Sequence, residues 1–311
     1  MPDRTALSHW RDAWDVALYD DGGFFRREAP ASHFRTAAND SVPFAAAIWR
    51  LVQELGHTAV VDMAAGRGEL LAQLHVFSQG TLTLTGVEIG PRPQSLPPEV
   101  EWLSALPEHI DGLLIANEWL DNIPCDVVEV DETGTTRYVL VDKETGEEHL
   151  GEECRDPWLA KWWPLTEPGS RAEIGTTRDE AWSQAVARVD GTAIAIDYGH
   201  TRDDRPPFGS LRSYLEGRDV DVVPDGSRDV TAHVAVDAVA ARCGATITRQ
   251  RDALQALGVR GNRPPIGLAS TDPTGYLAAL AATSASAELL AHGGWGDFWW
   301  IRVDRESSMT D

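Results

Sequence analysis

The sequence has 311 residues, of which 42% are hydrophobic and 24% are charged. This globular composition excludes collagen, low-complexity disorder and a small scaffold held together by disulfides. With 27 Lys and Arg against 49 Asp and Glu, the net charge is -22. That charge argues against binding to nucleic acids or to anionic lipids, because their phosphates would be repelled. A basic, neutral or small-molecule partner is expected instead.

The three cysteines, Cys125, Cys154 and Cys243, are too few and too far apart for a disulfide framework, which predicts a reducing compartment. We expect no signal peptide at the N-terminus. We also expect no membrane insertion, since no apolar run approaches the ~20 residues that cross a bilayer. The predicted location is cytoplasmic.

The predicted elements begin with an N-terminal helical cap over residues 1–56. Its clearest helix spans 41–56, with Ser41 as the N-cap, Pro43 in the first turn and Gly56 as the stop. Apolar residues fall on one face of this helix. We therefore expect it to pack on a part of the chain that follows.

Residues 57–311 are expected to form a Rossmann-like domain of the α/β class. Its strands are short apolar runs separated by helical stretches, a pattern typical of a parallel sheet covered on both faces. The predicted strands lie at 58–65, 81–90, 100–106, 111–118 and 191–199, with a further apolar segment at 297–303. The predicted helices lie at 69–77, 178–188, from Thr231 to about Arg242, 252–257 and 275–290.

Two segments interrupt this domain: an insertion around residues 125–175 and a lid around 200–230. The insertion begins with two alternating runs over 126–142 that flank a turn at 132–134, which predicts a β-hairpin. The acidic segment 142–156 is expected to be a loop. The lid segment is rich in Pro, Gly and Asp, which favour irregular backbone.

Polar residues gather where four of the predicted strands end. In an open parallel sheet these carboxyl ends meet at one edge, and ligands bind there. The residues are the segment Asp62 to Gly68, then Glu88, then Asn117 and Glu118, and finally Asp197 and Tyr198.

The first of these segments reads DMAAGRG and contains Asp62, Ala64, Gly66 and Gly68. Small residues let the backbone turn tightly and approach a ligand, and the following helix points free N–H groups at it. Glu88, with Ile89 beside it, ends the next strand, where an acid accepts hydrogen bonds from ribose hydroxyls. The two features predict a cofactor that carries a nucleoside.

The glycine spacing discriminates between two such cofactors. A dinucleotide fingerprint needs G-x-G-x-x-G, and from Gly66 its third glycine would fall on Leu71, which disfavours an NAD-dependent oxidoreductase. An acid followed by a short small-residue turn resembles the loop of S-adenosylmethionine (SAM) methyltransferases. Asn117 is a further candidate for cofactor binding, and Trp102 or Leu103 for contact with the adenine. The alternative is an ordinary strand-to-helix turn.

Several segments together resemble one family, the MidA-like SAM-dependent methyltransferases. The similar segments are HFRTA (33–37), VVDMAAGRGELLAQL (60–74), GVEIGP (86–91), ANEWLDNIPCDVVEV (116–130), IDYG (196–199), GSLRSY (209–214) and DVTAHV (229–234). Three positions depart from the family pattern. Ala64 replaces a glycine, Ala65 replaces a proline, and Ala235 stands where the family often has an acid.

The family includes the mitochondrial complex I assembly factor that methylates a protein arginine. The resemblance therefore implies a Rossmann-like class I methyltransferase with SAM as cofactor and a protein arginine as acceptor. A respiratory-complex subunit would be one such substrate. A small-molecule acceptor, or an assembly factor that binds SAM without catalysis, are the alternatives.

The chemistry of methyl transfer singles out the polar residues after the fourth strand. Asn117, Glu118 and Asp121 lie there, and one or two carboxylates can accept the planar fork of an arginine. Alternatively, Asp121 caps the next turn and Glu118 is a solvated loop acid. Asp197 could orient the substrate. Tyr198 could pack on the cofactor or substrate, or belong to the core.

Other residues carry weaker signals. Arg212 and Tyr214 lie in the expected lid, and His233 is a proton acceptor or a structural histidine. The sequence contains no C-x-x-C and no H-E-x-x-H, so we predict no metal site. The paired tryptophans, at 162–163 and 299–300, would pack in the core or line a groove for a protein partner.

Overall fold

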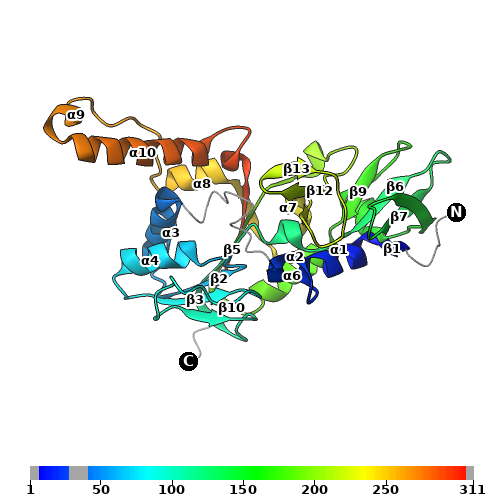
Figure 1. Ribbon diagram of the computed structural model, residues 1–311, viewed down its shortest axis with the longest axis horizontal. Coiled ribbons are helices and arrows are strands. Elements are labelled where there is room, and N and C mark those ends of the chain that lie inside the picture. The colour runs from blue at the N-terminus through cyan, green and yellow to red at the C-terminus, as the bar shows by residue number, and fades with distance from the viewer. Residues whose placement is uncertain (1–6, 28–40, 306–311) are drawn as a thin grey trace. The chain divides into compact units, whose positions relative to one another are not determined.

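The computed structural model describes residues 7–27 and 41–305 (Figure 1). The chain divides into two compact units. The first unit comprises Met1–Phe34, Glu118–Ala187 and Gly199–Ala245, and the second comprises Arg35–Asn117, Arg188–Tyr198 and Thr246–Asp311. The expected cap over 1–56 contributes to both units, while the expected insertion and lid belong to the first. The HFRTA segment at 33–37 lies outside the described residues.

The second unit is built on a seven-stranded sheet with the order β16-β17-β10-β5-β2-β3-β4. All pairs from β10 to β4 are parallel, and β17 is antiparallel to both of its neighbours. The predicted parallel sheet and the α/β class are confirmed. The strands are β2 (Ala59–Met63), β3 (Thr83–Val87), β4 (Glu101–Leu103), β5 (Ile110–Asn117), β10 (Val189–Asp197), β16 (Thr246–Arg249) and β17 (Trp299–Asp304).

The strand order creates a switch point between β2 and β5. From β2 the chain passes to β3 and β4 on one side, and it then returns to β5 on the other side of β2. Loops that follow the two strands diverge at such a point and leave room for a ligand beyond the carboxyl ends. The loop after β2 and the end of β5 are therefore the first places to examine for a site.

One face of this sheet packs against helices. Alternate residues of the strands, including Val60, Leu113 and Ile194, are buried in a single core with the apolar sides of the helices. The helices are α3 (Val42–Leu55), α4 (Glu69–Ser78), α8 (Gln250–Ala256) and α10 (Pro273–Leu290), with the short α9 (Leu268–Thr271) beside α10. The packing of α3 confirms the prediction from its apolar face.

The start of α3 differs from the sequence prediction in one respect. Ser41 occupies the N-cap position, but its side chain makes no capping hydrogen bond. Its Oγ is buried without a partner among residues 7–27 and 41–305. The predicted N-cap position of Ser41 is therefore confirmed, but the capping hydrogen bond from its side chain is not formed. The C-terminal stop is confirmed, since Gly56 adopts φ 70° and its N–H donates to the carbonyls of Val52 and Gln53.

The first unit is built on an antiparallel sheet with the order β1-β7-β6-β9, and β8 pairs with β7. The predicted hairpin is confirmed as β6 paired with β7. The predicted acidic loop at 142–156 is wrong in part, because Glu148–Glu153 forms β8 against β7. The strands are β1 (Leu7–His9), β6 (Asp126–Val130), β7 (Thr136–Asp142), β8 (Glu148–Glu153) and β9 (Arg171–Ile174).

The two faces of this sheet bury different helices. Val127 and Val139 face one core with α1 (Trp10–Tyr19), near the short α2 (Phe24–Arg27). The next residue of β6, Val128, faces the opposite core with α5 (Pro157–Trp162) and α7 (Val236–Cys243). This alternation is the expected consequence of a two-residue period along each strand. The helix α6 (Thr176–Val186), which packs on α7, agrees with the helix predicted at 178–188.

Residues of the expected lid form small sheets. β12 (Arg212–Leu215) pairs with β13 (Arg218–Val220) and with β14 (Asp229–Thr231). A two-stranded sheet joins β11 (Gly199–His200) to β15 (Val234–Ala235). The helix predicted from Thr231 begins only at Val236. That prediction is wrong at its start, because Thr231 is paired with Arg212 in the β12–β14 ladder.

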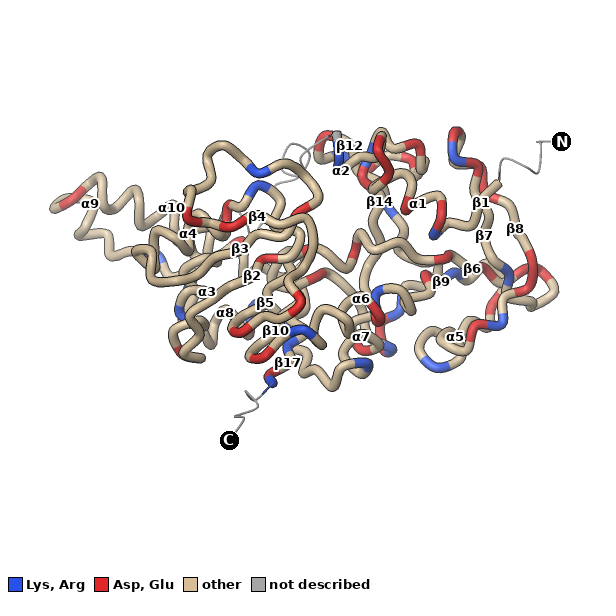
Figure 2. The backbone as a smooth tube through the Cα atoms, turned by 90° about the horizontal axis from the view of Figure 1, so that it is seen from below, with Lys and Arg blue, Asp and Glu red and all other residues tan. Residues whose placement is uncertain are grey.

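Acidic residues are spread over the segments of both units and are not confined to one (Figure 2). None of the helices in the described ranges is both long and apolar enough to cross a bilayer.

Arg178 is the largest buried charge of the first unit and connects three of its segments. Its side chain is 2% exposed. The guanidinium donates hydrogen bonds to the carbonyls of Asp121 at 2.7 Å, Ile123 at 3.1 Å, Ala232 at 3.1 Å and His233 at 2.9 Å. These carbonyls belong to the turn around η2 (Leu120–Asn122) and to the segment between β14 and β15. Arg178 therefore fixes both segments relative to α6.

We predict that Arg178→Met destabilises the protein strongly. The variant keeps an apolar stem of similar length but removes the guanidinium donor from four carbonyls, of which that of Asp121 still accepts from the N–H of Ala232. Each buried carbonyl left unsatisfied costs about 1–3 kcal/mol. The free energy of unfolding, measured by urea denaturation, should fall by about 3 kcal/mol or more. Arg155→Met is the control, since that side chain is 81% exposed. Equal stability of the two variants would contradict the assigned role.

Candidate functional site

The loop after β2 has an unusual backbone. Ala64, Gly66 and Gly68 adopt φ angles of 57°, 58° and 74°, all in the left-handed region. Glycine tolerates this region, whereas a residue with a Cβ does so at a cost of order 1–3 kcal/mol. The strained Ala64 stands where the resembled family has glycine. A strained, small-residue loop that leads into α4 is the kind of backbone that approaches a ligand closely.

Glu88 ties this loop to the end of β3. Its Oε2 accepts a hydrogen bond from the N–H of Gly66 at 3.1 Å, and its Oε1 accepts from Ile89 at 2.7 Å and Gly90 at 3.3 Å. Burial raises the pKa of Glu88, and these three N–H donors lower it. Each carboxylate oxygen has two lone pairs, so Glu88 retains acceptor capacity beyond these bonds.

Asp62 lies inside β2 and is 4% exposed. Burial raises its pKa to about 8, and the nearby charges of Glu69 and Glu88 add to the effect. Three carboxyl groups thus gather around one backbone loop. This arrangement is costly unless a cation shares the site, so it favours a ligand that carries positive charge.

Trp102 packs tightly against the same loop. A Cβ placed at Gly86 would lie 2.5 Å from its ring, and one at Gly68 would lie 3.4 Å from it. The indole N–H donates to the carbonyl of Gly90 at 3.2 Å. The next residue, Leu103, accepts a hydrogen bond from the N–H of Glu88 through its carbonyl at 2.9 Å. Of the two residues expected near the adenine, Trp102 therefore packs on the loop after β2 and Leu103 is bonded to Glu88.

The ends of β5 and β10 carry the remaining candidates of the second unit. Asn117 is 5% exposed and is paired with Ile196 in the parallel ladder. Asp197 is completely buried, and its carboxylate accepts a hydrogen bond from the N–H of Tyr198 at 2.9 Å. The ring of Tyr198 lies 5.5 Å from that of Phe298. As predicted, the polar strand ends of this sheet lie along one edge.

Glu118 and Asp121 belong to the first unit and take part in an acidic cluster there. Glu118 directly follows β5 and has φ 51°, a strained angle for a residue other than glycine. Asp121 lies in η2, and its Oδ2 accepts a hydrogen bond from the hydroxyl of Thr231 at 2.7 Å. Because Thr231 is 110 residues away in sequence, this bond does not support the alternative in which Asp121 only caps its own turn.

Asp229 is the third member of the cluster, and the sequence did not single it out. Its side chain is 6% exposed, and its Oδ1 accepts a hydrogen bond from the amide of Asn122 at 2.9 Å. Burial raises its pKa well above the usual value, and the charges of Asp121 and Glu118 raise it further. The only sequence signal was the DVTAHV segment of the family resemblance.

Tyr214, one of the two residues singled out in the expected lid, lies close to this cluster. Tyr214 is paired with Asp229 in the β12–β14 ladder. Burial raises the pKa of Tyr214. For His233, partial burial lowers the pKa, and the guanidiniums of Arg178 and Arg212 lower it further. Within the described ranges, no group of three or more His, Cys, Asp or Glu residues is arranged to hold a metal ion.

Comparison with known proteins decides the family. Residues 44–252 match a family described as "Putative S-adenosyl-L-methionine-dependent methyltransferase". The chain belongs to this family. The methyltransferase has SAM as its cofactor, and the resemblance drawn from the sequence is confirmed at this level. No curated protein matches the chain.

Two solved structures share the fold over almost the whole chain. One is a candidate methyl transferase from Burkholderia thailandensis bound to S-adenosyl-homocysteine, with 24% identity, a TM-score of 0.81, and coverage of 98% of this chain and 89% of the other. The second is a native crystal structure of a protein of the same superfamily from that organism, with 23% identity, a TM-score of 0.78 and the same coverage. The methyltransferase therefore has the Rossmann-like fold predicted from its strands.

The loop after β2, together with Asp62 and Glu88, would fit SAM in charge and in shape. SAM carries a sulfonium and an ammonium, which suit the carboxyl groups of Asp62 and Glu88, and a ribose whose hydroxyls would donate to the remaining lone pairs of Glu88. The left-handed backbone at Ala64, Gly66 and Gly68 would let the loop approach the cofactor closely. When bound, SAM supplies a methyl group activated by the positive sulfur.

The raised pKa of Asp62 predicts a trade between stability and cofactor binding. Without ligand, the buried carboxyl is protonated below pH 8, and its folded pKa lies above the unfolded value near 3.9. As pH rises from 4 to 8, the wild type should lose up to about 1.4 kcal/mol of stability per pH unit more than Asp62→Asn does.

The measurements are urea denaturation and calorimetric titration with S-adenosyl-homocysteine. Asp62→Asn should bind this ligand at least about 10-fold more weakly, since a charge-assisted contact is lost. The matched control is Asp111→Asn. Asp111 is exposed and lies near the N-terminal end of β5, away from the carboxyl ends of the strands. Unchanged affinity in Asp62→Asn would remove Asp62 from the cofactor site.

Glu88→Gln tests the contact expected with the ribose. The amide keeps one oxygen acceptor but places an NH₂ group where a carboxylate oxygen accepted, so it repels the loop N–H of Gly66 or a ribose hydroxyl. We expect the dissociation constant for S-adenosyl-homocysteine to rise about 10- to 100-fold. Glu108→Gln, an exposed position of the same unit, should bind as the wild type does.

Proposed function

We propose that the methyltransferase transfers the methyl group of SAM to a nitrogen of a protein arginine side chain. The observation that supports the proposal is the acidic cluster of Glu118, Asp121 and Asp229. A guanidinium offers five N–H donors in a plane and carries a permanent positive charge, which carboxylates accept with two parallel hydrogen bonds. The net charge of -22 favours a basic substrate in the same way.

The cluster is built so that its members differ in role. Asp121 is fixed by the hydroxyl of Thr231, and its backbone carbonyl is fixed by Arg178. Asp229 has a pKa well above its usual value and is held by Asn122. Because burial and the neighbouring carboxylates disfavour the charged form of Asp229, more of the charge of the cluster falls on its other members. Glu118, which follows Asn117 at the end of β5, is the carboxylate that we assign to the substrate guanidinium.

Methyl transfer itself is an in-line displacement. A bond forms between the guanidinium nitrogen and the methyl carbon while the carbon–sulfur bond breaks, and the electron pair of that bond returns to the sulfur. The methylated nitrogen then releases one proton to water, which leaves a methylguanidinium. The enzyme accelerates this step chiefly by orientation, and Glu118 would hold the guanidinium while concentrating electron density on its free nitrogen. Asn117, Asp197 and Tyr198 are proposed to position the reactants from the strand ends.

The test is transfer of label from tritiated SAM to proteins in a lysate of the host cell. Acid hydrolysis of the labelled proteins should release methylated arginine. Label in a small molecule instead would replace the protein arginine by a small-molecule acceptor. A protein that binds S-adenosyl-homocysteine but gives no label above a Gly66→Val control would favour a non-catalytic assembly factor.

We predict that Glu118→Gln separates binding from catalysis. The variant should bind S-adenosyl-homocysteine with unchanged affinity, because Glu118 is not among the carboxylates of the β2 loop. Methyl transfer should fall about 100-fold or more, the usual scale for loss of an electrostatic contact at the reacting centre. Glu132→Gln, at an exposed hairpin turn, serves as the control. Loss of cofactor binding in Glu118→Gln would show that its role has been assigned wrongly.

A further inference from the structure

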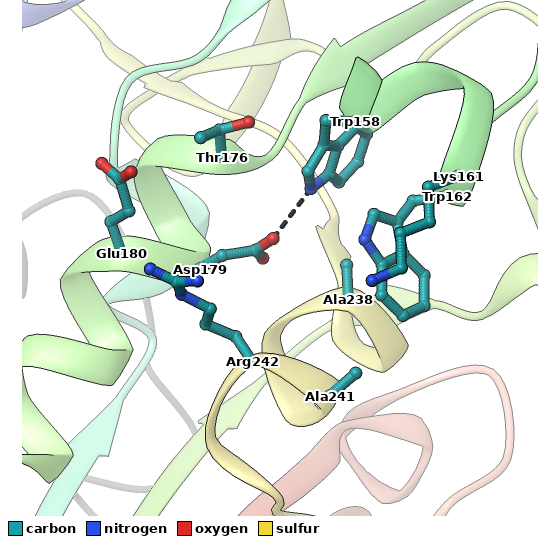
Figure 3. A pocket seen from close by; sticks show the side chains of 9 residues that line it. All are labelled: Trp158, Lys161, Trp162, Thr176, Asp179, Glu180, Ala238, Ala241 and Arg242. Atoms are coloured by element: carbon teal, nitrogen blue, oxygen red, sulfur yellow. Dashed lines mark hydrogen bonds between the residues drawn. The ribbon is translucent and has the colours of Figure 1, made fainter. Parts of the chain in front are cut away.

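The first unit contains a pocket of about 310 Å³ lined by residues of α5, α6 and α7 (Figure 3). None of the residues proposed above for cofactor binding or methyl transfer lines it. Its volume lies at the lower end of the range for small-molecule sites, about 300–1,000 Å³. It therefore suits a small ligand, and it is too small for SAM or for a segment of a folded partner.

The floor of the pocket contains two buried acceptors that the protein leaves unused. Asp179 is 6% exposed, and its Oδ2 accepts a hydrogen bond from the indole N–H of Trp158 at 2.8 Å. Figure 3 shows this carboxylate extending from α6 toward Trp158. The other oxygen of Asp179 and the hydroxyl of Thr176 have no hydrogen-bond partner among the described residues. Buried polar groups are rarely left unpaired, so these two acceptors indicate a ligand that donates hydrogen bonds.

The walls of the pocket are apolar and partly aromatic. Trp158 and Trp162 contribute indole rings from α5, and Ala238 and Ala241 contribute small side chains from α7. Indole rings bind both hydrocarbon chains and organic cations well. The small residues on the facing helix keep the space between the helices open. The walls thus favour a ligand with an aliphatic middle.

The rim of the pocket carries charge of both signs with a positive excess. Lys161, Glu180 and Arg242 line it and are exposed. The ammonium of Lys161 lies 4.7 Å from the centre of the Trp162 ring. Two cations against one anion would repel a purely cationic ligand and attract an anionic group. The buried carboxylate of Asp179 would in turn repel a purely anionic ligand.

We propose that this pocket binds a small zwitterion of the amino-carboxylate class. Its ammonium donates hydrogen bonds to Oδ1 of Asp179 and to the hydroxyl of Thr176, its aliphatic chain lies between the indoles and the alanines, and its carboxylate faces Lys161 and Arg242. This assignment satisfies both unused acceptors and matches the charge of floor and rim. It does not rest on the proposed methyl acceptor or on the cofactor.

Binding should depend on pH through Asp179. Burial raises the pKa of Asp179 to about 6. Below that pH the carboxyl is protonated and no longer attracts an ammonium, so the affinity should fall up to about 10-fold per unit. The charged groups that face this region come from three helices: Lys161 on α5, Arg178 and Glu180 on α6, and Asp237 and Arg242 on α7.

Calorimetric titration of the full-length protein at pH 7.5 tests the proposal with three probes. 6-Aminohexanoate carries both charges, hexylamine lacks the carboxylate, and hexanoate lacks the ammonium. We expect 6-aminohexanoate to bind at least about 10-fold more tightly than either single-charge probe, since each loses one charge-assisted contact. Its affinity should fall between pH 7 and pH 5. L-Lysine and 4-aminobutanoate extend the series in size.

Two variants connect the binding to the floor of the pocket. Asp179→Asn keeps an oxygen for Trp158 but loses the charge, and Thr176→Val keeps the shape but loses the hydroxyl. Asp179→Asn should weaken the binding of 6-aminohexanoate at least about 10-fold, and Thr176→Val should weaken it about 3-fold. Asp221→Asn, an exposed carboxyl of the same unit, is the charge control. Circular dichroism of all variants verifies that they are folded.

Three results would overturn the proposal. The first is that none of 6-aminohexanoate, L-lysine and 4-aminobutanoate shows saturable binding to the folded wild type. The second is hexylamine binding as tightly as 6-aminohexanoate, which would mean that the rim recognises no carboxylate. The third is affinity unchanged in both Asp179→Asn and Thr176→Val, which would place the ligand elsewhere.

Discussion

The carboxylate of Glu88 is the contact on which the proposed cofactor site depends. By accepting hydrogen bonds from Gly66, Ile89 and Gly90 it joins two loops that follow neighbouring parallel strands, and it holds the left-handed turn of the first loop in place. It is buried near Asp62, so two carboxyl groups lie where burial disfavours their negative charge. The raised pKa of both groups shows this cost. A site that is costly without its ligand and favourable with a cationic one is a common property of binding sites.

The first unit also contains a buried charged group that joins distant segments, but this group is a cation. The guanidinium of Arg178 is buried, and its hydrogen bonds go to backbone carbonyls from two distant segments. One of these carbonyls belongs to Asp121, so the position of the acidic cluster depends on a residue of α6 that takes no part in the proposed chemistry. The same helix supplies Asp179 to the pocket between α5 and α7. Displacement of α6 would therefore disturb both places.

The sequence predicted those features that depend on local pattern. The parallel strands follow from short apolar runs, the β6–β7 hairpin from its turn, and the β2 loop and Glu88 from the spacing of small residues and an acid. Features that depend on pairing between distant segments were missed or wrong. β8 is acidic in sequence but forms a strand because β7 supplies its hydrogen bonds, and Thr231 pairs with Arg212 where a helix was expected. Asp229 and Asp179 could not be ranked above other acids, because burial and neighbours set their properties.

Two strained residues, Ala64 and Glu118, show how backbone cost relates to function. Both have left-handed φ angles that glycine would adopt without penalty. At position 64 the side chain is a methyl group, which contributes no polar contact in exchange for the strain. The glycine of the resembled family would therefore serve the loop at least as well. At position 118 glycine would relieve the strain but delete a carboxylate that acts on Asp229. Strain persists where the surrounding structure over-determines it. The strain at Glu118, unlike that at Ala64, is therefore consistent with a need for the carboxylate at this position. This is the physical reason for proposing that Glu118 binds the substrate guanidinium.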